Sequence, residues 1–296
     1  MPYGDPMATD EWTRWLLTRR DGGNAELRAQ HAVDLQVFRD EVLDRAGLAA
    51  DDTLLDVGAG TGLIAFGALD RLGPDGRVIF SDVSDAGLEE CRRRAGDDKR
   101  CSFVHASAED LSPIPDASVD VVTTRSVLIY CDHKAAAFRE FFRVLKPGGR
   151  LSIFEPINRF LLVHRGDSLF GLRDPEVADL LAKVVAVYRD GARRGENPMT
   201  DFDERDLLRW AAEAGFDGIE IDYRAQLDVP AEPIGDWEAR KKVAPNPLAP
   251  TYGEAMEAAL TAEEYSRLDS RMTQLAQSGT PTRRTLATTY LRALHP

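Results

Sequence analysis

The chain has 296 residues, of which 43% are hydrophobic and 29% charged, a composition typical of a globular protein with a buried core rather than of a disordered chain. Its net charge of −13 argues against a nucleic-acid partner, because binding nucleic acid requires a basic face that neutralises phosphates. No run approaches the ~20 apolar residues that span a bilayer, and the N-terminus lacks a signal peptide's basic start, so we expect a cytoplasmic protein with no membrane partner.

The first 48 residues are expected to lie outside the central fold. Residues 1–23 are predicted to be irregular, and a helix is predicted over residues 25–46, where Gly47 is a natural stop. Four apolar side chains recur in this helix at helical spacing: Leu35, Phe38, Val42 and Ala46.

A short apolar run then ends in an acid and breaks into three alternating glycines, in the order Asp56-Val57-Gly58-Ala59-Gly60-Thr61-Gly62. The residues before the glycines suit a buried parallel strand, and those after them suit one face of a helix. Since glycine has no Cβ, the backbone can turn sharply here and approach a ligand closely. The sequence therefore predicts a cofactor-binding loop.

The spacing of the glycines argues against two common nucleotide loops. A dinucleotide fingerprint needs a third glycine where Leu63 stands, and a phosphate loop needs a lysine after Gly62. The next predicted strand ends in Asp82, whose carboxylate could accept hydrogen bonds from both hydroxyls of a ribose. Capping the following helix is the alternative role for this acid. We expect a ligand that carries a ribose but demands no phosphate cradle.

Strands and helices alternate through the core, which predicts a parallel sheet with helices on both faces. The expected strands are 53–57, 77–82, 101–105, 119–124 and 149–155, and the expected helices 61–72, 85–95 and 134–145. Lys146-Pro147-Gly148-Gly149 is expected to be the turn between a helix and a strand. The three cysteines form no CxxC pair and the five histidines no HExxH pair, so no disulfide framework or metal site is predicted.

The region from Asp52 to about Pro156 resembles the small-molecule branch of the class I S-adenosylmethionine-dependent methyltransferases. Four motifs carry the resemblance: Asp56–Gly62, Asp82, Ser107-Ala108-Glu109-Asp110-Leu111 and Leu145-Lys146-Pro147-Gly148-Gly149-Arg150. It implies a Rossmann-like α/β fold with a seven-stranded, mostly parallel sheet, in which the last segment adds an antiparallel strand. It also implies S-adenosylmethionine as the cofactor and methyl transfer as the reaction.

By this resemblance the cofactor-binding residues are Asp56, Gly58, Ala59, Gly60, Asp82, Val83, Ala108, Glu109, Arg125 and Ser126. The glycine turn would pass beneath the methionine part, Asp82 would hold the ribose, and Ala108 with Glu109 would flank the adenine. Arg125 and Ser126 would offer backbone groups to the amino-acid end. Ser107 replaces the acid often found in the family, which leaves the adenine amino group to the backbone or to a neighbour.

Three additions to the core are expected to form a helical lid. The expected divisions are a lid segment 1–48, a cofactor-binding core 49–156, a lid insertion 157–200, core 201–229, a second lid insertion 230–281 and a closing strand 282–296. Asp174-Pro175 marks a helix start in the first insertion, and a capping box at Thr261 marks one in the second. Because methyl transfer needs an acceptor held in line with water excluded, the lid is expected to enclose the acceptor.

Acceptor-side residues are expected after the fourth and fifth strands. Trp15, Tyr130 and Glu155 are the predicted substrate-binding residues. Trp12 and Trp15 are expected to help to wall the pocket, and hydrophobic anchoring of the N-terminal segment is their alternative role. Tyr130 and His133 are the predicted catalytic residues, and His133 is the better general base by type because imidazole titrates near neutral pH. The alternative is that Asp132 and His133 only begin the next helix, with Asp132 as its cap.

Basic residues stand out in the presumed lid: Arg14, Arg19, Arg20, Arg240, Lys241 and Lys242. If they face inward they favour an anionic acceptor, whereas solvated surface charge is the alternative. We therefore expect methylation of a small-molecule or peptide-like acceptor, at a carboxylate or hydroxyl oxygen. N- or C-methylation, a reaction without methyl transfer and a regulatory binding protein are the alternatives, while Leu63 argues against a nicotinamide-dependent dehydrogenase. Neither the acceptor nor the oligomeric state can be read from the sequence.

Overall fold

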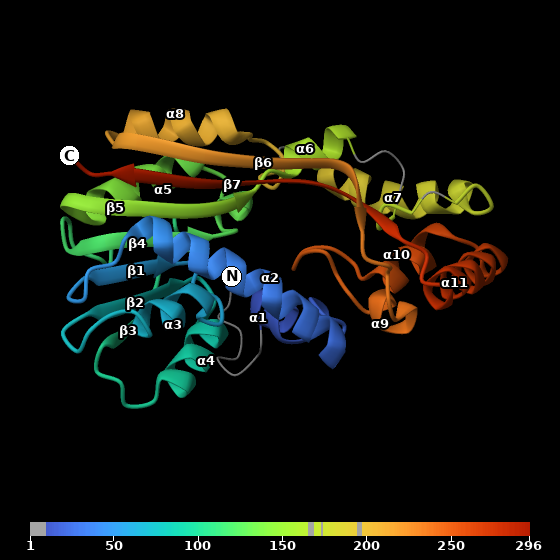
Figure 1. Cartoon of the computed structure of the whole chain (residues 1–296), viewed down its shortest axis with the longest axis horizontal. Helices are drawn as coiled ribbons and strands as arrows, with labels where there is room; N and C mark the ends of the chain where they lie inside the picture. The colour runs from blue at the N-terminus through green and yellow to red at the C-terminus, as the bar shows by residue number, and fades with distance from the viewer. Residues whose placement is uncertain (1–9, 165–168, 173, 194–196) are drawn as a thin grey trace, which may run out of the picture.

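A seven-stranded sheet with the strand order β3-β2-β1-β4-β5-β7-β6 forms the centre of the molecule (Figure 1). The computed structural model describes residues 10–164, 169–172, 174–193 and 197–296. Its strands are β1 (Thr53–Val57), β2 (Arg77–Asp82), β3 (Cys101–His105), β4 (Val119–Arg125), β5 (Leu145–Pro156), β6 (Asp217–Ala231) and β7 (Thr282–Leu294). β7 runs antiparallel to both β5 and β6, and the other neighbours are parallel, which confirms the predicted mostly parallel sheet.

Helices cover both faces of this sheet. The core helices are α2 (Ala25–Ala46), α3 (Leu63–Leu69), α4 (Asp85–Ala95), α5 (Lys134–Val144) and α8 (Glu204–Ala214). Alternate side chains of a strand point to opposite faces, so Leu54 of β1 packs with α2, α3 and α4, while Leu55 and Val57 pack with α5 and α8. Two separate apolar clusters therefore hold the helices to the sheet.

The lid helices are α6 (Asn158–His164) and α7 (Ala178–Arg193) in the first insertion, and α9 (Trp237–Lys241), α10 (Tyr252–Ala259) and α11 (Ala262–Gln277) in the second. Phe160 of α6 packs against a cluster of the sheet, whereas the other four helices share an apolar cluster of their own. Leu180 and Val184 of α7 are buried against Trp237, Met256 and Met272 from the second insertion. Figure 1 shows these helices beyond one end of the sheet, with β6 and β7 extending toward them. In the described part of the chain, none of the helices has the length and apolarity that crossing a membrane requires.

Side-chain caps set several helix ends at the predicted places. Asn24 accepts hydrogen bonds from two backbone N–H groups at the start of α2, and Gly47 ends that helix in the left-handed conformation. Thr261 and Glu264 form the predicted capping box of α11. The N-cap of α4 is Ser84 and not Asp82, for which helix capping was the alternative role.

The N-terminal segment is helical where the sequence predicts irregular structure. α1 (Glu11–Arg14) continues into a π-helical turn, η1 (Trp15–Arg19), while residues 1–9 lie outside the described residues. Asp10 caps α1 by accepting a hydrogen bond from the Thr13 amide at 2.8 Å. A helix this short depends on tertiary contacts, which leave no periodic pattern in the sequence.

The Lys146–Gly149 turn lies inside β5 rather than before it. Val119 pairs with Leu145 and Val121 pairs with Arg150, so the four residues between them bulge from the strand. Gly148 has a φ of +80°, and its N–H donates to the His295 carbonyl oxygen at 2.9 Å. The predicted turn therefore exists, but the chain continues as a strand on both sides of it.

Candidate functional site

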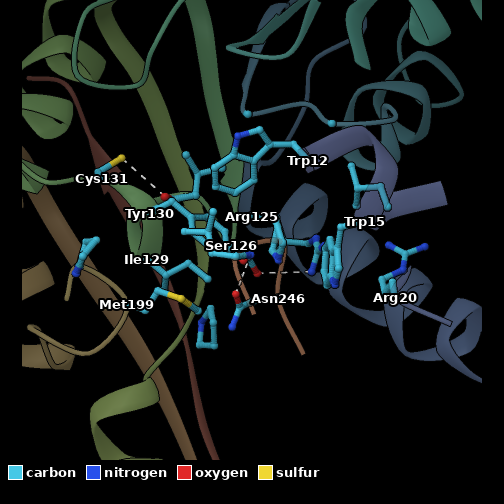
Figure 2. A pocket seen from close by; sticks show the side chains of 18 of the residues that line it. Trp12, Trp15, Arg20, Arg125, Ser126, Ile129, Tyr130, Cys131, Met199 and Asn246 are labelled. Carbon is cyan, nitrogen blue, oxygen red and sulfur yellow. Dashed lines mark hydrogen bonds between the residues drawn. The ribbon is translucent and has the colours of Figure 1, made fainter. Parts of the chain in front are cut away.

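A cavity of about 960 Å³ opens where β1, β2 and β4 end, between the sheet and the lid. This is the edge at which open α/β sheets bind ligands. Figure 2 shows side chains from distant parts of the chain around it: Trp12 and Trp15 from the N-terminal segment, Arg125 from the end of β4, Ser126 and Tyr130 from the loop after it, and Met199 and Asn246 from the insertions.

The glycine turn forms the floor of the cavity beside β1. Gly58, Gly60 and Gly62 have φ angles of +68°, +56° and +82°, which side-chain-bearing residues rarely adopt. A Cβ at Gly58 would lie 2.2 Å from Cγ2 of Val127, so the close approach of the two loops excludes any side chain there. The turn leaves an open cradle bounded by backbone.

Two buried carboxylates hold this turn in place. Asp56 accepts hydrogen bonds from the Thr123 hydroxyl and the Ala65 amide, both at 3.0 Å, and burial raises its pKa to about 7. Asp82 accepts from the Gly60 amide at 2.7 Å and the Ser84 amide at 2.8 Å, and burial raises its pKa as well. Asp82 thus joins the glycine turn to the loop after β2.

The N-terminal segment crosses over this turn. The Thr13 and Ser84 hydroxyls are 2.8 Å apart, and the Ser84 hydroxyl donates to the Asp10 carboxylate at 2.5 Å. Leu16 lies above Gly60, where its Cδ1 would be 3.1 Å from a Cβ added to that glycine. The indole N–H of Trp15 donates to the Ala244 carbonyl oxygen at 2.8 Å, which joins the segment to the second insertion.

The loop after β4 supplies the polar centre of the cavity. Arg125 is half-buried, and its guanidinium donates to the Ser126 hydroxyl at 3.4 Å. Burial lowers the pKa of Arg125, and the Arg20 charge lowers it further, against the smaller opposing effects of Glu155 and Asp56. Among the described residues no carboxylate forms an ion pair with Arg125.

Aromatic rings border this polar centre. Tyr130 packs edge-on against Trp12 with the ring centroids 4.7 Å apart, and burial raises the pKa of its phenol. The cavity thus offers an apolar, aromatic surface beside a cation.

Most of the predicted site residues line this one cavity: Trp12, Trp15, Asp56, Gly58, Ala59, Gly60, Asp82, Val83, Ala108, Glu109, Arg125, Ser126 and Tyr130. Ala108 and Glu109 follow β3, at the same edge of the sheet as Asp82. Their grouping follows from the topology, because successive parallel strands end at one edge.

His133, predicted as a catalytic base, does not line the cavity. It is exposed at the start of α5, where its backbone N–H donates to the Glu109 carboxylate. Lys134 takes the inward position instead, and its ammonium donates to the Asp201 carboxylate at 2.6 Å and the Cys131 carbonyl oxygen at 2.9 Å. His133 precedes the helix with non-helical backbone angles (φ −121°, ψ 67°) and is exposed, whereas Lys134, the first helical residue, is buried.

Glu155, predicted to bind substrate, is fully buried beneath the loop after β4 and does not line the cavity. Its Oε1 accepts hydrogen bonds from the Val127 amide at 2.8 Å and the Leu128 amide at 2.9 Å, while Oε2 has no partner. Burial raises its pKa to about 7. The geometry makes Glu155 a support for the loop that carries Ser126 and Tyr130.

Of the six basic lid residues, only Arg20 lines this cavity. Arg19 pairs with Glu254 at 2.6 Å, and Lys241 pairs with Asp269 at 2.8 Å. The Nε of Arg20 is buried without a hydrogen-bond partner.

Sequence reasoning missed the lid residues that close the cavity from the far side, including Asn197, Met199, Pro245 and Asn246. Turn-forming residues are clustered in both loops, which predicts a loop but not the surface that it faces.

Known proteins match part of the chain, including the glycine turn and Asp82. Residues 55–153 match the family described as methyltransferase domain. The ubiquinone/menaquinone biosynthesis C-methyltransferase UbiE of Pseudomonas putida is 34% identical over 183 residues, covering 60% of this chain and 70% of that protein. UbiE of Cronobacter sakazakii is 32% identical over 187 residues, covering 60% and 71%.

Solved structures share the fold at low sequence identity. Phosphoethanolamine N-methyltransferase 2 of Haemonchus contortus, in complex with S-adenosyl-L-methionine, superposes with a TM-score of 0.50 at 17% identity, covering 96% of this chain and 56% of that one. The [4+2]-cyclase SpnF superposes with a TM-score of 0.50 at 20% identity, covering 88% and 81%. Taken with the methyltransferase domain match and the UbiE relatives, the chain belongs to the class I S-adenosylmethionine-dependent methyltransferases and uses S-adenosylmethionine as its cofactor.

Proposed function

We propose that the glycine turn, Asp82 and the Ala108–Glu109 pair hold the cofactor, and that Val83, Arg125 and Ser126 complete its site. The cradle supports this assignment, because a Cβ at Gly58 would collide with Val127 and the backbone alone can border a ligand there. Each Asp82 oxygen accepts one backbone N–H, so each keeps a lone pair for a ribose hydroxyl. When bound, S-adenosylmethionine supplies a methyl group on a positively charged sulfur.

For the acceptor, we propose a small molecule or peptide-like compound that presents an acidic oxygen, a carboxylate or a phenolate, to Arg125. The observation that carries this proposal is a half-buried guanidinium with no ion-pair partner among the described residues. Buried charges in proteins are normally paired, so this one favours an anionic ligand. Trp12, Trp15 and Tyr130 favour an apolar or aromatic body for the same molecule.

Oxygen is the proposed methyl-accepting atom. A guanidinium lowers the pKa of an acidic oxygen, so the oxygen is already a nucleophile and needs no separate base. Carbon is the second candidate, because the two UbiE relatives are C-methyltransferases and a phenolate is also nucleophilic at its ring carbons.

The test begins with the purified protein, whose co-purified nucleoside is identified by mass. Aromatic carboxylates, phenols and peptides are then screened with radiolabelled S-adenosylmethionine, and NMR of the product identifies the methylated atom. We expect one S-adenosylhomocysteine per product molecule. Product formed without S-adenosylhomocysteine would instead indicate a reaction in which the methyl group is not transferred from the cofactor.

Arg125→Met is expected to lower kcat/KM for an acidic acceptor by roughly 10- to 150-fold, the value of a hydrogen bond to a charged group. Its affinity for S-adenosylmethionine should stay within about twofold, because the proposed cofactor contacts of Arg125 are backbone groups. Steady-state kinetics and calorimetry measure the two quantities. The control is Arg92→Met, which removes an exposed arginine paired with Glu89. An equal loss of cofactor affinity in Arg125→Met would show that the guanidinium serves the cofactor.

Removing residues 1–20 is expected to reduce turnover at least about tenfold, because the wall that excludes water and positions the acceptor is lost. Trp12→Ala, which leaves the segment in place, tests the same wall by removing the ring that packs against Tyr130. Circular dichroism checks that both variants remain folded. Full activity of the truncated protein would contradict a role for this segment in the acceptor site.

A further inference from the structure

A second cavity, of about 870 Å³, lies beside the first. Its walls come from α2, the ends of β6 and β7, and the start of the second insertion, which includes Arg240. Leu161 and Tyr252 line both cavities, so the two spaces adjoin at these side chains. Of the residues singled out in the sequence, only Arg240 of the basic lid set lines this second space, and no predicted cofactor-binding, substrate-binding or catalytic residue does.

The half-buried end of this cavity is cationic. The Arg240 side chain donates from Nε to the Ile234 carbonyl oxygen at 2.9 Å, and no described carboxylate forms an ion pair with it. His31 faces the same cavity, and its buried Nδ1 has no hydrogen-bond partner. Burial lowers the pKa of both groups, and the Arg240 charge lowers that of His31 further.

The acids of this cavity lie at its exposed rim. Asp34 and Glu232 are exposed, and Asp228 pairs with Arg283 at 2.9 Å. Arg284, also exposed, adds another positive charge there. Asp34 raises the pKa of His31, but burial and the charges of Arg240 and Arg20 outweigh it, and none of these three acids forms an ion pair with Arg240.

Arg20 connects the two cavities electrostatically. It lines the first cavity, its Nε is buried without a partner, and its charge lowers the pKa of both Arg125 and His31. The Arg20 charge therefore acts on one group that lines each cavity. Phe170 and Tyr252, with ring centroids 4.4 Å apart, add an aromatic wall on the second side.

We propose that the second cavity is the distal part of the acceptor site, where Arg240 and His31 bind a carboxylate at the end of an apolar or aromatic tail. This rests on the proposed function, because the reacting end of the acceptor is taken to lie in the first cavity. Arg240 supplies charge-assisted hydrogen bonds, His31 an additional ring nitrogen, and Phe170 packs against the tail.

The test measures binding of 3-phenylpropanoate and of its uncharged amide to the protein saturated with S-adenosylhomocysteine. NMR titrations give both dissociation constants. The carboxylate is expected to bind at least about tenfold more tightly than the amide, and Arg240→Met is expected to abolish that preference. Arg284→Met, a change at the exposed rim, should retain it.

Failure of this inference can be told from failure of the proposed function. Equal binding of acid and amide, or a preference lost in Arg125→Met but kept in Arg240→Met, overturns the distal site and leaves the proposed acceptor chemistry standing. If only Arg240→Met loses the preference for the carboxylate over the amide, the distal site is supported. That result is independent of the proposed role of Arg125, which fails if Arg125→Met methylates acidic acceptors normally. Unchanged S-adenosylhomocysteine affinity in Arg240→Met is part of the expected result, and a tenfold loss overturns the assignment to the acceptor.

Discussion

Gly58→Ala is expected to abolish cofactor binding and to lower the free energy of unfolding by about 2–5 kcal/mol, from overpacking and backbone strain together. The added Cβ would lie 2.2 Å from Val127 Cγ2, and Gly58 has a φ of +68°. To avoid this overlap, either the loop after β4 or the glycine turn must move, and both segments border the cavity. Calorimetry with S-adenosylhomocysteine and urea unfolding measure the two effects.

Gly47→Ala is the matched control. Gly47 also has a left-handed backbone, with a φ of +58°, but nothing lies within 4 Å of a Cβ built on it. We expect this variant to lose about 1 kcal/mol of stability and no cofactor affinity. Unaltered cofactor binding in Gly58→Ala would contradict the role of the glycine turn as a cofactor cradle.

Glu155 is expected to make the protein less stable as the pH rises from about 4.5 to about 7. Burial raises the pKa of its carboxyl from 4.5 to about 7, so within this window the folded state keeps a proton that the unfolded state has released. Raising the pH therefore favours unfolding, by about 3 kcal/mol across the window. Asp56, with its pKa raised from 3.8 to about 7, acts in the same direction.

Glu155→Gln removes one of these two titrations and should flatten the fall in stability with pH, as measured by urea unfolding between pH 4.5 and pH 8. Asp56 continues to titrate, so part of the slope remains. The exposed Glu263→Gln is the control and should follow the wild-type curve. Parallel curves for Glu155→Gln and the wild type would refute the buried-carboxyl account.

Much of the cofactor side of the site could be predicted because it is local. An apolar strand, an acid and alternating glycines are contiguous in the sequence, and Asp82 ends the next strand of the sheet. Parallel strands bring such ends together by topology alone. The family resemblance added the expected roles, which the comparisons support at the level of the methyltransferase and its cofactor.

The acceptor side could not be predicted in the same way. His133 and Lys134 are neighbours, and only the packing of α5 decides that the lysine faces inward to Asp201. Glu155 lies next to the end of its strand, but packing buries it under the loop after β4, whose amides it accepts, rather than in the cavity. Both outcomes depend on contacts between residues far apart in the chain.

By itself the sequence determined the alternation of strands and helices, the glycine turn and a ribose-binding acid, because the strand period, the glycines and the strand-end acid act over a few residues, and the family resemblance added the methyl donor. Only the tertiary structure decided which cations face the cavities. Arg19 and Arg20 are adjacent, yet one pairs with Glu254 on the second insertion and the other lines the first cavity. That difference comes from the packing of the N-terminal segment against the second insertion, which no local pattern records.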